Sequence, residues 1–339
     1  MKIYSKKNLN EYDFSLTYDD ISLVPTEVSR IKSRTEASTR CSFLGFELGL
    51  PVISSPMDSV TGIDMAKELT SLGCIGILNR FDSSLNELLN NGEARSLVHA
   101  VSIALNTEME LIEKLAERNY LICIDTANAN NRAVLDKTES IKKKFSSVKI
   151  IVGNIAHGAS LKQLVDCGDD AVRVGIGSGS VCTTSIQTGI GIGQVSALLN
   201  VFFAREREKI NISLIADGGI KNPGDAVKAI SLGADAVMLG RMLAGTKETP
   251  GEVIRYNGQL WKKYRGSASF GVKMKNEFIE GEETMVPYKG TVRNTIDSIS
   301  DGLKSSMSYM NCMTLDELRK TETFAVLSNS SYLERLPRV

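Results

Sequence analysis

Short apolar segments rich in β-branched residues recur along the chain and alternate with stretches of helical periodicity. These segments have the length of strands, and they lack the polar alternation of a sheet that has one face in water. Near-continuous apolar strands separated by helices are typical of a parallel sheet that is covered on both faces. We identify eight such segments: residues 52–54, 74–78, 98–103, 120–124, 149–152, 171–174, 214–216 and 236–239.

The number of strand–helix units predicts an α/β fold, a closed (β/α)8 TIM barrel, rather than an open sheet. Amphipathic stretches at 106–118 and 131–145 separate several of the strands, and residues 296–306 and 314–320 are expected to be further helices. A chain of 339 residues fits one barrel with extensions. We therefore expect a single catalytic domain over residues 1–339, with an open doubly wound sheet as the structural alternative.

The regular alternation ends after the eighth apolar segment. Residues 255–292 are polar, with scattered glycine and lysine and no clear period. A loop this long in a compact domain is usually functional or disordered, so we expect a mobile loop, or flap, over the active site. It contains the acidic run 280–283, one member of which could act as a general acid or base.

Composition and charge narrow the class of protein. Forty basic and forty acidic residues give a net charge of 0, which argues against a nucleic-acid-binding protein. The six cysteines form no C-x-x-C pair and there are two histidines, so a structural zinc site is not expected. The first residues lack the apolar core of a signal peptide, and no run of 18 apolar residues predicts a membrane span. We expect a cytoplasmic protein with free thiols.

The segment Val174-Gly-Ile-Gly-Ser-Gly-Ser-Val-Cys-Thr-Thr184 is the most informative part of the chain. Its glycines permit close approach of the backbone to a ligand or ion. The loop presents Cys182 among hydroxyl groups, and a thiolate is a strong nucleophile near neutral pH. Thr184 could hydrogen-bond a leaving group or relay a proton. The alternative is a glycine-rich turn around a buried cysteine.

Three further strand ends carry polar groups. Asp217, followed by two glycines, suits a ribose diol, whereas the nearby Asp225 suits a helix cap. Gly240 and Arg241 follow the last predicted strand, where phosphate usually binds in this fold, although Arg241 could instead be a surface charge. Ser55 and Met57 could contact phosphate and base. The stretch Asp125, Thr126, Ala127 and Asn128 places polar groups at the barrel mouth.

These stretches together resemble the IMP dehydrogenase/GMP reductase family over nearly the whole chain. The resemblance rests on Tyr18-Asp-Asp-Ile21, Ser55-Pro-Met-Asp58, residues 174–184, Ala216-Asp-Gly-Gly219, Tyr264-Arg-Gly266 and Val286-Pro-Tyr-Lys-Gly290.

The resemblance implies a barrel that binds IMP, XMP or GMP, with Cys182 bonding to purine C2. It also implies that Asp217 holds the ribose, and that Met57 and the loop from Tyr264 to Ser269 flank the nucleotide. As in family members of the dehydrogenase type, potassium would bind carbonyl oxygens of the cysteine loop, and family members are commonly homotetramers. The implied phosphate residues are Ser180, Gly219, Gly240 and Arg241, the flanking loop includes Gly266, Ser267 and Ser269, and the potassium carbonyls are those of Gly175, Gly177 and Cys182.

Three features of the resemblance favour the reductase, which converts GMP to IMP and ammonia with NADPH. Only about twenty residues separate Arg80 from the next strand, too few for the CBS modules of most dehydrogenases. Residues 267–285 contain neither arginine nor tyrosine, and the dehydrogenase flap supplies such a pair. The flap is also short. The stretch 125–128 resembles the cofactor side of the reductase, and Thr184 with Glu280 would assist the departure of ammonia.

Two positions depart from the family pattern, namely Arg241, where relatives usually have serine or glycine, and Ala129, where reductases usually have glycine. They keep other readings open. These are an IMP dehydrogenase without CBS modules, a paralogue acting on another purine nucleotide, and a nucleotide-binding protein without catalytic activity.

Overall fold

Eight parallel strands close into a barrel in the order β10-β11-β4-β5-β6-β7-β8-β9. The structure is a computed structural model that describes residues 2–81, 84–90, 96–266 and 282–335. All eight predicted strands are confirmed as β4 (Val52–Ser54), β5 (Ile75–Leu78), β6 (Ala100–Ile103), β7 (Leu121–Asp125), β8 (Ile150–Ile155), β9 (Ala171–Val174), β10 (Ser213–Asp217) and β11 (Ala236–Leu239).

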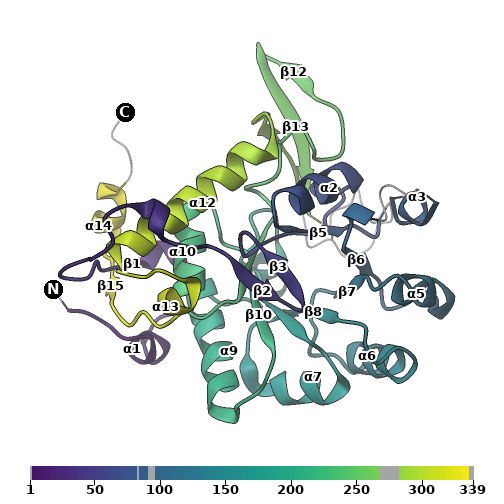
Figure 1. Ribbon diagram of the computed structural model, residues 1–339, viewed down its shortest axis with the longest axis horizontal. Coiled ribbons are helices and arrows are strands. Elements are labelled where there is room, and N and C mark those ends of the chain that lie inside the picture. The colour runs from purple at the N-terminus through teal and green to yellow at the C-terminus, as the bar shows by residue number, and fades with distance from the viewer. Residues whose placement is uncertain (1, 82–83, 91–95, 267–281, 336–339) are drawn as a thin grey trace.

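Helices surround the barrel, as expected for parallel strands joined by crossovers (Figure 1). The predicted helical stretches are confirmed as α5, α6, α12 and α13. The helices are α1 (Lys6–Asn10), α2 (Ile63–Ser71), α3 (Ser84–Asn90), α5 (Met109–Ala116), α6 (Arg132–Lys144), α7 (Leu161–Cys167), α8 (Thr184–Thr188), α9 (Gln194–Glu208), α10 (Pro223–Ser231), α12 (Val292–Tyr309), α13 (Leu315–Arg319) and α14 (Asn329–Glu334), with 3₁₀ turns η1 (Tyr18–Asp20), η2 (Arg34–Glu36) and η3 (Gly158–Ser160).

Two cores explain why the barrel strands read as continuous apolar runs. One face of each strand points inward, where Ile53, Ile75, Ile151 and their neighbours form a small cluster; the other face packs against the helices. Because both faces are buried, most positions in these strands are apolar, and Arg173 in β9 is an exception. The hairpin of β2 (Cys41–Phe43) and β3 (Phe46–Leu48) contributes Phe43 and Leu48 to the inner cluster, while β1 (Ile21–Leu23) pairs with β15 (Phe324–Val326).

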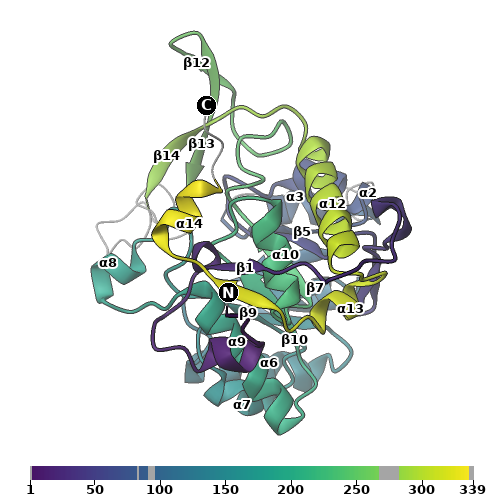
Figure 2. The same ribbon diagram turned by 90° about the vertical axis from the view of Figure 1, so that its left-hand side faces the viewer.

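The segment expected to be one irregular loop, residues 255–292, contains strands at both of its ends. β12 (Ile254–Tyr256), β13 (Gln259–Arg265) and β14 (Glu283–Pro287) form an antiparallel sheet, and β12 and β13 project from the barrel (Figures 1 and 2). The expectation was wrong for these residues because most of them are exposed on both faces. Such strands lack apolar alternation, and pairing across residues 266–282 leaves no local signal.

Helix capping follows the sequence in the part of the chain nearest the predicted ribose site. Asn222 accepts a hydrogen bond from the Asp225 amide at the start of α10, and Pro223 occupies the first turn. The Asp225 carboxylate accepts bonds from the Lys221 amide and the Asn222 side chain. Asp225 is therefore a structural residue, as expected. None of the helices in the described ranges is long and apolar enough to cross a membrane.

Asp169, between α7 and β9, is a buried carboxyl group that makes the stability of the fold depend on pH. Its carboxyl group is buried and accepts a bond of 3.0 Å from Thr138, and burial raises its pKa from 3.8 to about 7. Between these values the folded protein holds a proton that the unfolded chain releases, so stability falls as pH rises from about 4 to 7. The slope is at most about 1.4 kcal/mol per pH unit.

We expect Asp169→Asn to remove this loss, so that its free energy of unfolding rises relative to the parent protein across that pH range. Urea unfolding at pH 4.5, 6 and 7.5 measures the difference. The exposed Asp166, paired with Lys162 at 3.0 Å, provides the control Asp166→Asn. Parallel pH profiles for the parent and Asp169→Asn would contradict the assignment.

Candidate active site

The loop after β9 is held against the end of β10 by close backbone packing. Gly175 has a φ of 144°, and a Cβ there would lie 2.1 Å from the carbonyl oxygen of Asp217. Only glycine fits such an approach. Ser178 donates to Gln194 at 2.8 Å, and Gln194 donates to the Val174 carbonyl at 2.6 Å. The loop that carries the cysteine therefore has a fixed starting point.

Cys182 and Thr184 are brought together as the sequence predicts. The Cys182 thiol donates to the Thr184 hydroxyl, with 3.1 Å between Sγ and Oγ1. Cys182 is half-buried, and its amide donates to the Gly179 carbonyl at 3.1 Å. A thiol that is partly accessible and beside a hydroxyl group can attack a ligand and pass a proton along the same contact.

The predicted flap contacts the cysteine loop through Glu282. The Gly266 amide donates to the Glu282 carbonyl at 3.0 Å, and the Glu282 amide donates to the Val181 carbonyl at 3.0 Å. Glu282 is thus bonded to the residue that precedes Cys182. Three predicted site residues, Glu280, Ser267 and Ser269, lie outside the described residues.

The predicted phosphate and base residues gather around Gly240. A Cβ on Gly240 would lie 3.1 Å from the Tyr264 hydroxyl, 3.3 Å from Met57 Sδ and 3.8 Å from Ser55 Cβ. The Tyr264 hydroxyl is in turn 3.1 Å from the Ser180 hydroxyl. Burial raises the pKa of Tyr264, so this phenol stays a neutral hydrogen-bond donor.

Gly219 lies next to this cluster in the loop after β10. Its φ of 75° is in the left-handed region, and a Cβ there would be 3.5 Å from the ring of Tyr18. The neighbouring Gly218 would place a Cβ 2.3 Å from the Ser178 hydroxyl. These glycines let the backbone of one loop lie against the next.

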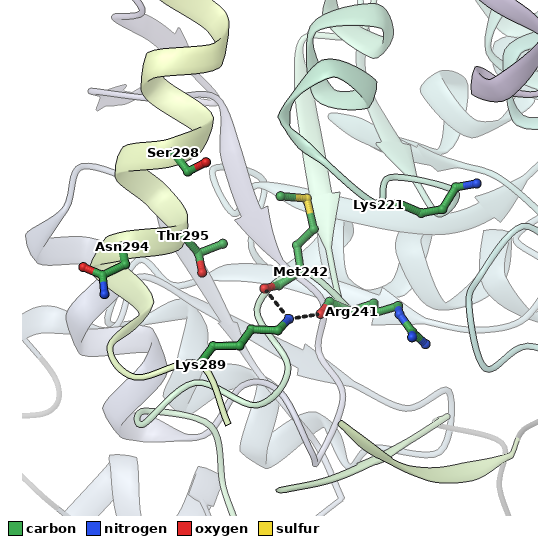
Figure 3. Close-up of a pocket in the computed structure, with 7 residues that line it drawn as sticks. All are labelled: Lys221, Arg241, Met242, Lys289, Asn294, Thr295 and Ser298. Carbon is green, nitrogen blue, oxygen red and sulfur yellow. Dashed lines mark hydrogen bonds between the residues drawn. The ribbon is translucent and has the colours of Figure 1, made fainter. Parts of the chain in front are cut away.

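Arg241 directly follows Gly240 in the chain, and its side chain is exposed. It lines a cavity of about 320 Å³, whose other lining residues are Lys221, Met242, Lys289, Asn294, Thr295 and Ser298 (Figure 3). The Lys289 ammonium donates to the carbonyls of Arg241 and Met242 at 3.0 and 3.2 Å. Lys289 therefore supports the backbone of the loop after β11.

Asp217 is held by two side chains that the sequence analysis did not identify. Asn154 donates to its Oδ2 at 2.8 Å, Arg173 donates to the same oxygen through Nε at 3.0 Å, and Arg173 Nη2 lies 2.9 Å from it in an ion pair. All of these contacts to described residues use Oδ2. Oδ1 is left to accept a hydrogen bond from a ligand, as the ribose assignment requires.

Arg173 also reaches the other side of the barrel mouth. Its Nη1 donates to Asp125 Oδ1 at 2.7 Å, and Arg80 Nε lies 3.3 Å from Asp125 Oδ2. Arg173 is only 7% exposed, and its two carboxylates hold the pKa of its guanidinium well above the usual value. The sequence did carry a signal for this residue, because it is the one charge within the apolar run 171–174.

The stretch 125–128 presents its groups in different ways. The Asp125 carboxylate is buried in the arginine network, and the Thr126 amide and hydroxyl donate to the Gly153 carbonyl at 3.2 and 2.6 Å. Ala127 and Asn128 are exposed, with the Asn128 side chain accepting from the Asn130 amide at 3.0 Å. Ala127 and Asn128 are therefore the two exposed residues of this stretch that are accessible to a cofactor. Arg173 links Asp125, the first residue of the stretch, to Asp217.

The carbonyls predicted to bind potassium have hydrogen-bond partners. Gly175 accepts from Asn154 at 2.8 Å, and Gly177 accepts from Ser185 at 3.5 Å. A carbonyl oxygen has two lone pairs, and carbonyl rings are the ligands that hold potassium in proteins. Two of the three carbonyls thus already accept a side-chain hydrogen bond, and potassium binding stays a prediction from the family resemblance.

Comparison with known proteins gives consistent results over the whole chain. The family model of the IMP dehydrogenase / GMP reductase domain matches residues 15–338. The inosine-5'-monophosphate dehydrogenase of Borreliella burgdorferi is 31% identical, with 95% of this chain and 96% of the relative covered. The GMP reductases of Ligilactobacillus salivarius and Bacillus subtilis are each 33% identical, with 93% of this chain and 97% of the relative covered.

The buried position of Arg173 leads to a stability prediction. We expect Arg173→Met to lower the free energy of unfolding by about 3–5 kcal/mol, because two carboxylates stay buried without their partner. Arg173→Lys should lower the free energy of unfolding by a smaller amount, since an ammonium keeps the charge but cannot bond both carboxylates in the same way. Urea unfolding measures both.

Arg132→Met is the matched control, since Arg132 forms an exposed pair with Asp136 at 2.8 Å. That variant should lose less than about 1 kcal/mol. Similar small losses at both arginines would show that the Arg173 network does not hold the barrel mouth together.

Proposed function

The chain belongs to the IMP dehydrogenase/GMP reductase family, and from that premise we propose that it is a GMP reductase. The reaction is the NADPH-dependent conversion of GMP to IMP and ammonia. The contact of 3.1 Å between Cys182 and Thr184 at the barrel mouth is the observation on which the proposal depends. It supplies a nucleophile and a proton-carrying hydroxyl in one place.

Two features support the reductase over the dehydrogenase, the other activity of the family. β5 ends at Leu78 and β6 begins at Ala100, which leaves no room for a regulatory module between them. The dehydrogenase alignment runs over 393 positions and the Bacillus subtilis reductase alignment over 322, although both cover nearly all of this chain. The alignment of this chain with the dehydrogenase therefore contains many more gaps than the alignment with the reductase.

In the proposed mechanism, the Cys182 thiolate forms a bond to C2 of GMP. The 2-amino group takes up a proton through Thr184 and Glu280 and departs as ammonia. The nicotinamide of NADPH supplies the hydride that reduces C2 when it is bound. The C2–sulfur bond then breaks, IMP forms and Cys182 recovers its electron pair.

The remaining residues bind and orient the nucleotide. Asp217 Oδ1 accepts from the ribose, and Ser180, Gly219, Gly240 and Arg241 surround the phosphate end. Ser55, Met57, Gly266, Ser267 and Ser269 flank the nucleotide. These groups contribute by positioning C2 against the thiolate.

The cofactor and cation are assigned to opposite parts of the mouth. Residues 125–128 would contact the cofactor, with the exposed Asn128 as its polar contact. The carbonyls of Gly175, Gly177 and Cys182 would hold potassium and stabilise the cysteine loop. A cytoplasmic location and a homotetramer remain predictions; the exposed Ile254, Tyr256 and Leu260 of the projecting hairpin support self-association.

Absorbance at 340 nm tests the activity directly. With GMP and NADPH we expect absorbance to fall while ammonia is released, and Cys182→Ala should abolish turnover but keep nucleotide binding. A rise with IMP, NAD and potassium, without activity in the first mixture, would instead make the protein an IMP dehydrogenase. If Cys182→Ala kept its turnover, the role of the thiol would be refuted.

Glu280→Gln tests the proton transfer separately. An amide cannot protonate the leaving nitrogen, so we expect the deamination step to slow by about 10²–10⁴-fold. Hydride transfer, followed in reverse from IMP and NADP⁺ to the covalent intermediate, should change much less. Equal losses in both steps would contradict the division of roles between Glu280 and Cys182.

A further inference from the structure

The cavity beside Gly240 holds positive charge that the rest of the described chain does not compensate. It lies between the loops after β10 and β11 and the helix α12 (Figure 3). Lys221 is already paired with Asp19. Neither Arg241 nor Lys289 forms an ion pair with a carboxylate in the described ranges, and both line the same cavity.

Lys289 is held against the backbone of Arg241 by hydrogen bonds. It is half-buried, and two of its three N–H groups are directed to the carbonyls of Arg241 and Met242. Burial and the positive charge of Arg241 lower the pKa of Lys289. Lys289 and Arg241 line the same cavity, and two cations at one cavity are unfavourable unless an anion joins them.

The rest of the cavity wall suits the same ligand. Asn294, Thr295 and Ser298 come from α12 and offer neutral amide and hydroxyl groups. Gly240 directly precedes the lining residues Arg241 and Met242, and the hydroxyl groups of Tyr264 and Ser180 near it are neutral. The phosphate position at Gly240 thus has neutral groups around it, whereas the neighbouring cavity has the charged groups of Arg241 and Lys289 in its wall.

We propose that this cavity is a second anion subsite, which binds the β-phosphate of a purine nucleoside diphosphate whose first phosphate lies at Gly240. The inference rests on the proposed function for the position of that first phosphate. Arg241 carries the specificity, because a guanidinium can give two parallel hydrogen bonds to phosphate oxygens. Lys289 adds charge and holds the loop.

Calorimetric titration with GMP and GDP at low salt tests the subsite. We expect the parent protein to bind GDP about three- to tenfold more tightly than GMP, with the ratio falling as salt increases. In Arg241→Ser the ratio should approach one. Arg255→Ser, which removes an equally exposed arginine from β12, should keep the parent ratio.

Inorganic phosphate distinguishes the source of the anion. If GDP binds no more tightly than GMP, but phosphate raises the Tm of the GMP-saturated parent and not of Arg241→Ser, the subsite takes free phosphate and the anion assignment stands. If GDP gives no gain and phosphate has no such effect, the proposal is overturned.

Failure of the proposed function would look different. In that case GMP itself would neither bind nor turn over, while the effect of phosphate on the parent and on Arg241→Ser would still report on the subsite. Binding of GMP without any effect of a second phosphoryl group would overturn the subsite alone.

Discussion

The buried guanidinium of Arg173 connects the parts of the barrel mouth that have to act together. It extends from β9 to Asp217 at the end of β10 and to Asp125 at the end of β7. A charge in this position is stable only while both carboxylates remain paired with it. The arrangement therefore fixes two strand ends relative to the loop that carries Cys182.

This ion network also determines which oxygens stay available to ligands. Because Arg173 and Asn154 contact Oδ2 of Asp217, we assign the ribose contact to Oδ1. At the end of β7, Asp125 is paired with Arg173 and Arg80, and the exposed groups of the adjoining stretch are those of Ala127 and Asn128. One buried residue thus separates a substrate side from a cofactor side.

Charged side chains at the barrel mouth occur in two arrangements, one paired and one without a carboxylate partner in the described residues. Around Arg173, opposite charges are buried and paired, which gives rigidity. Around Arg241 and Lys289, like charges face one cavity and lack a carboxylate partner in the described chain. The first arrangement holds strand ends together without a ligand, whereas the second is the place where we propose that an anion binds.

The sequence by itself determined the barrel, because strands buried on both faces are mostly apolar along their length. It also predicted Cys182, Thr184 and Asp217 as site residues, since glycines and hydroxyls at strand ends form local patterns. Only the tertiary structure decided that Arg173 joins Asp125 to Asp217, and that Lys289 donates to the Arg241 carbonyl. Those pairs are far apart in the chain, and closure of the barrel brings them together. The strand β14 was missed for the same reason, because it pairs with β13 across residues 266–282. The hairpin of β12 and β13 is local, and it was missed because its exposed residues lack apolar alternation.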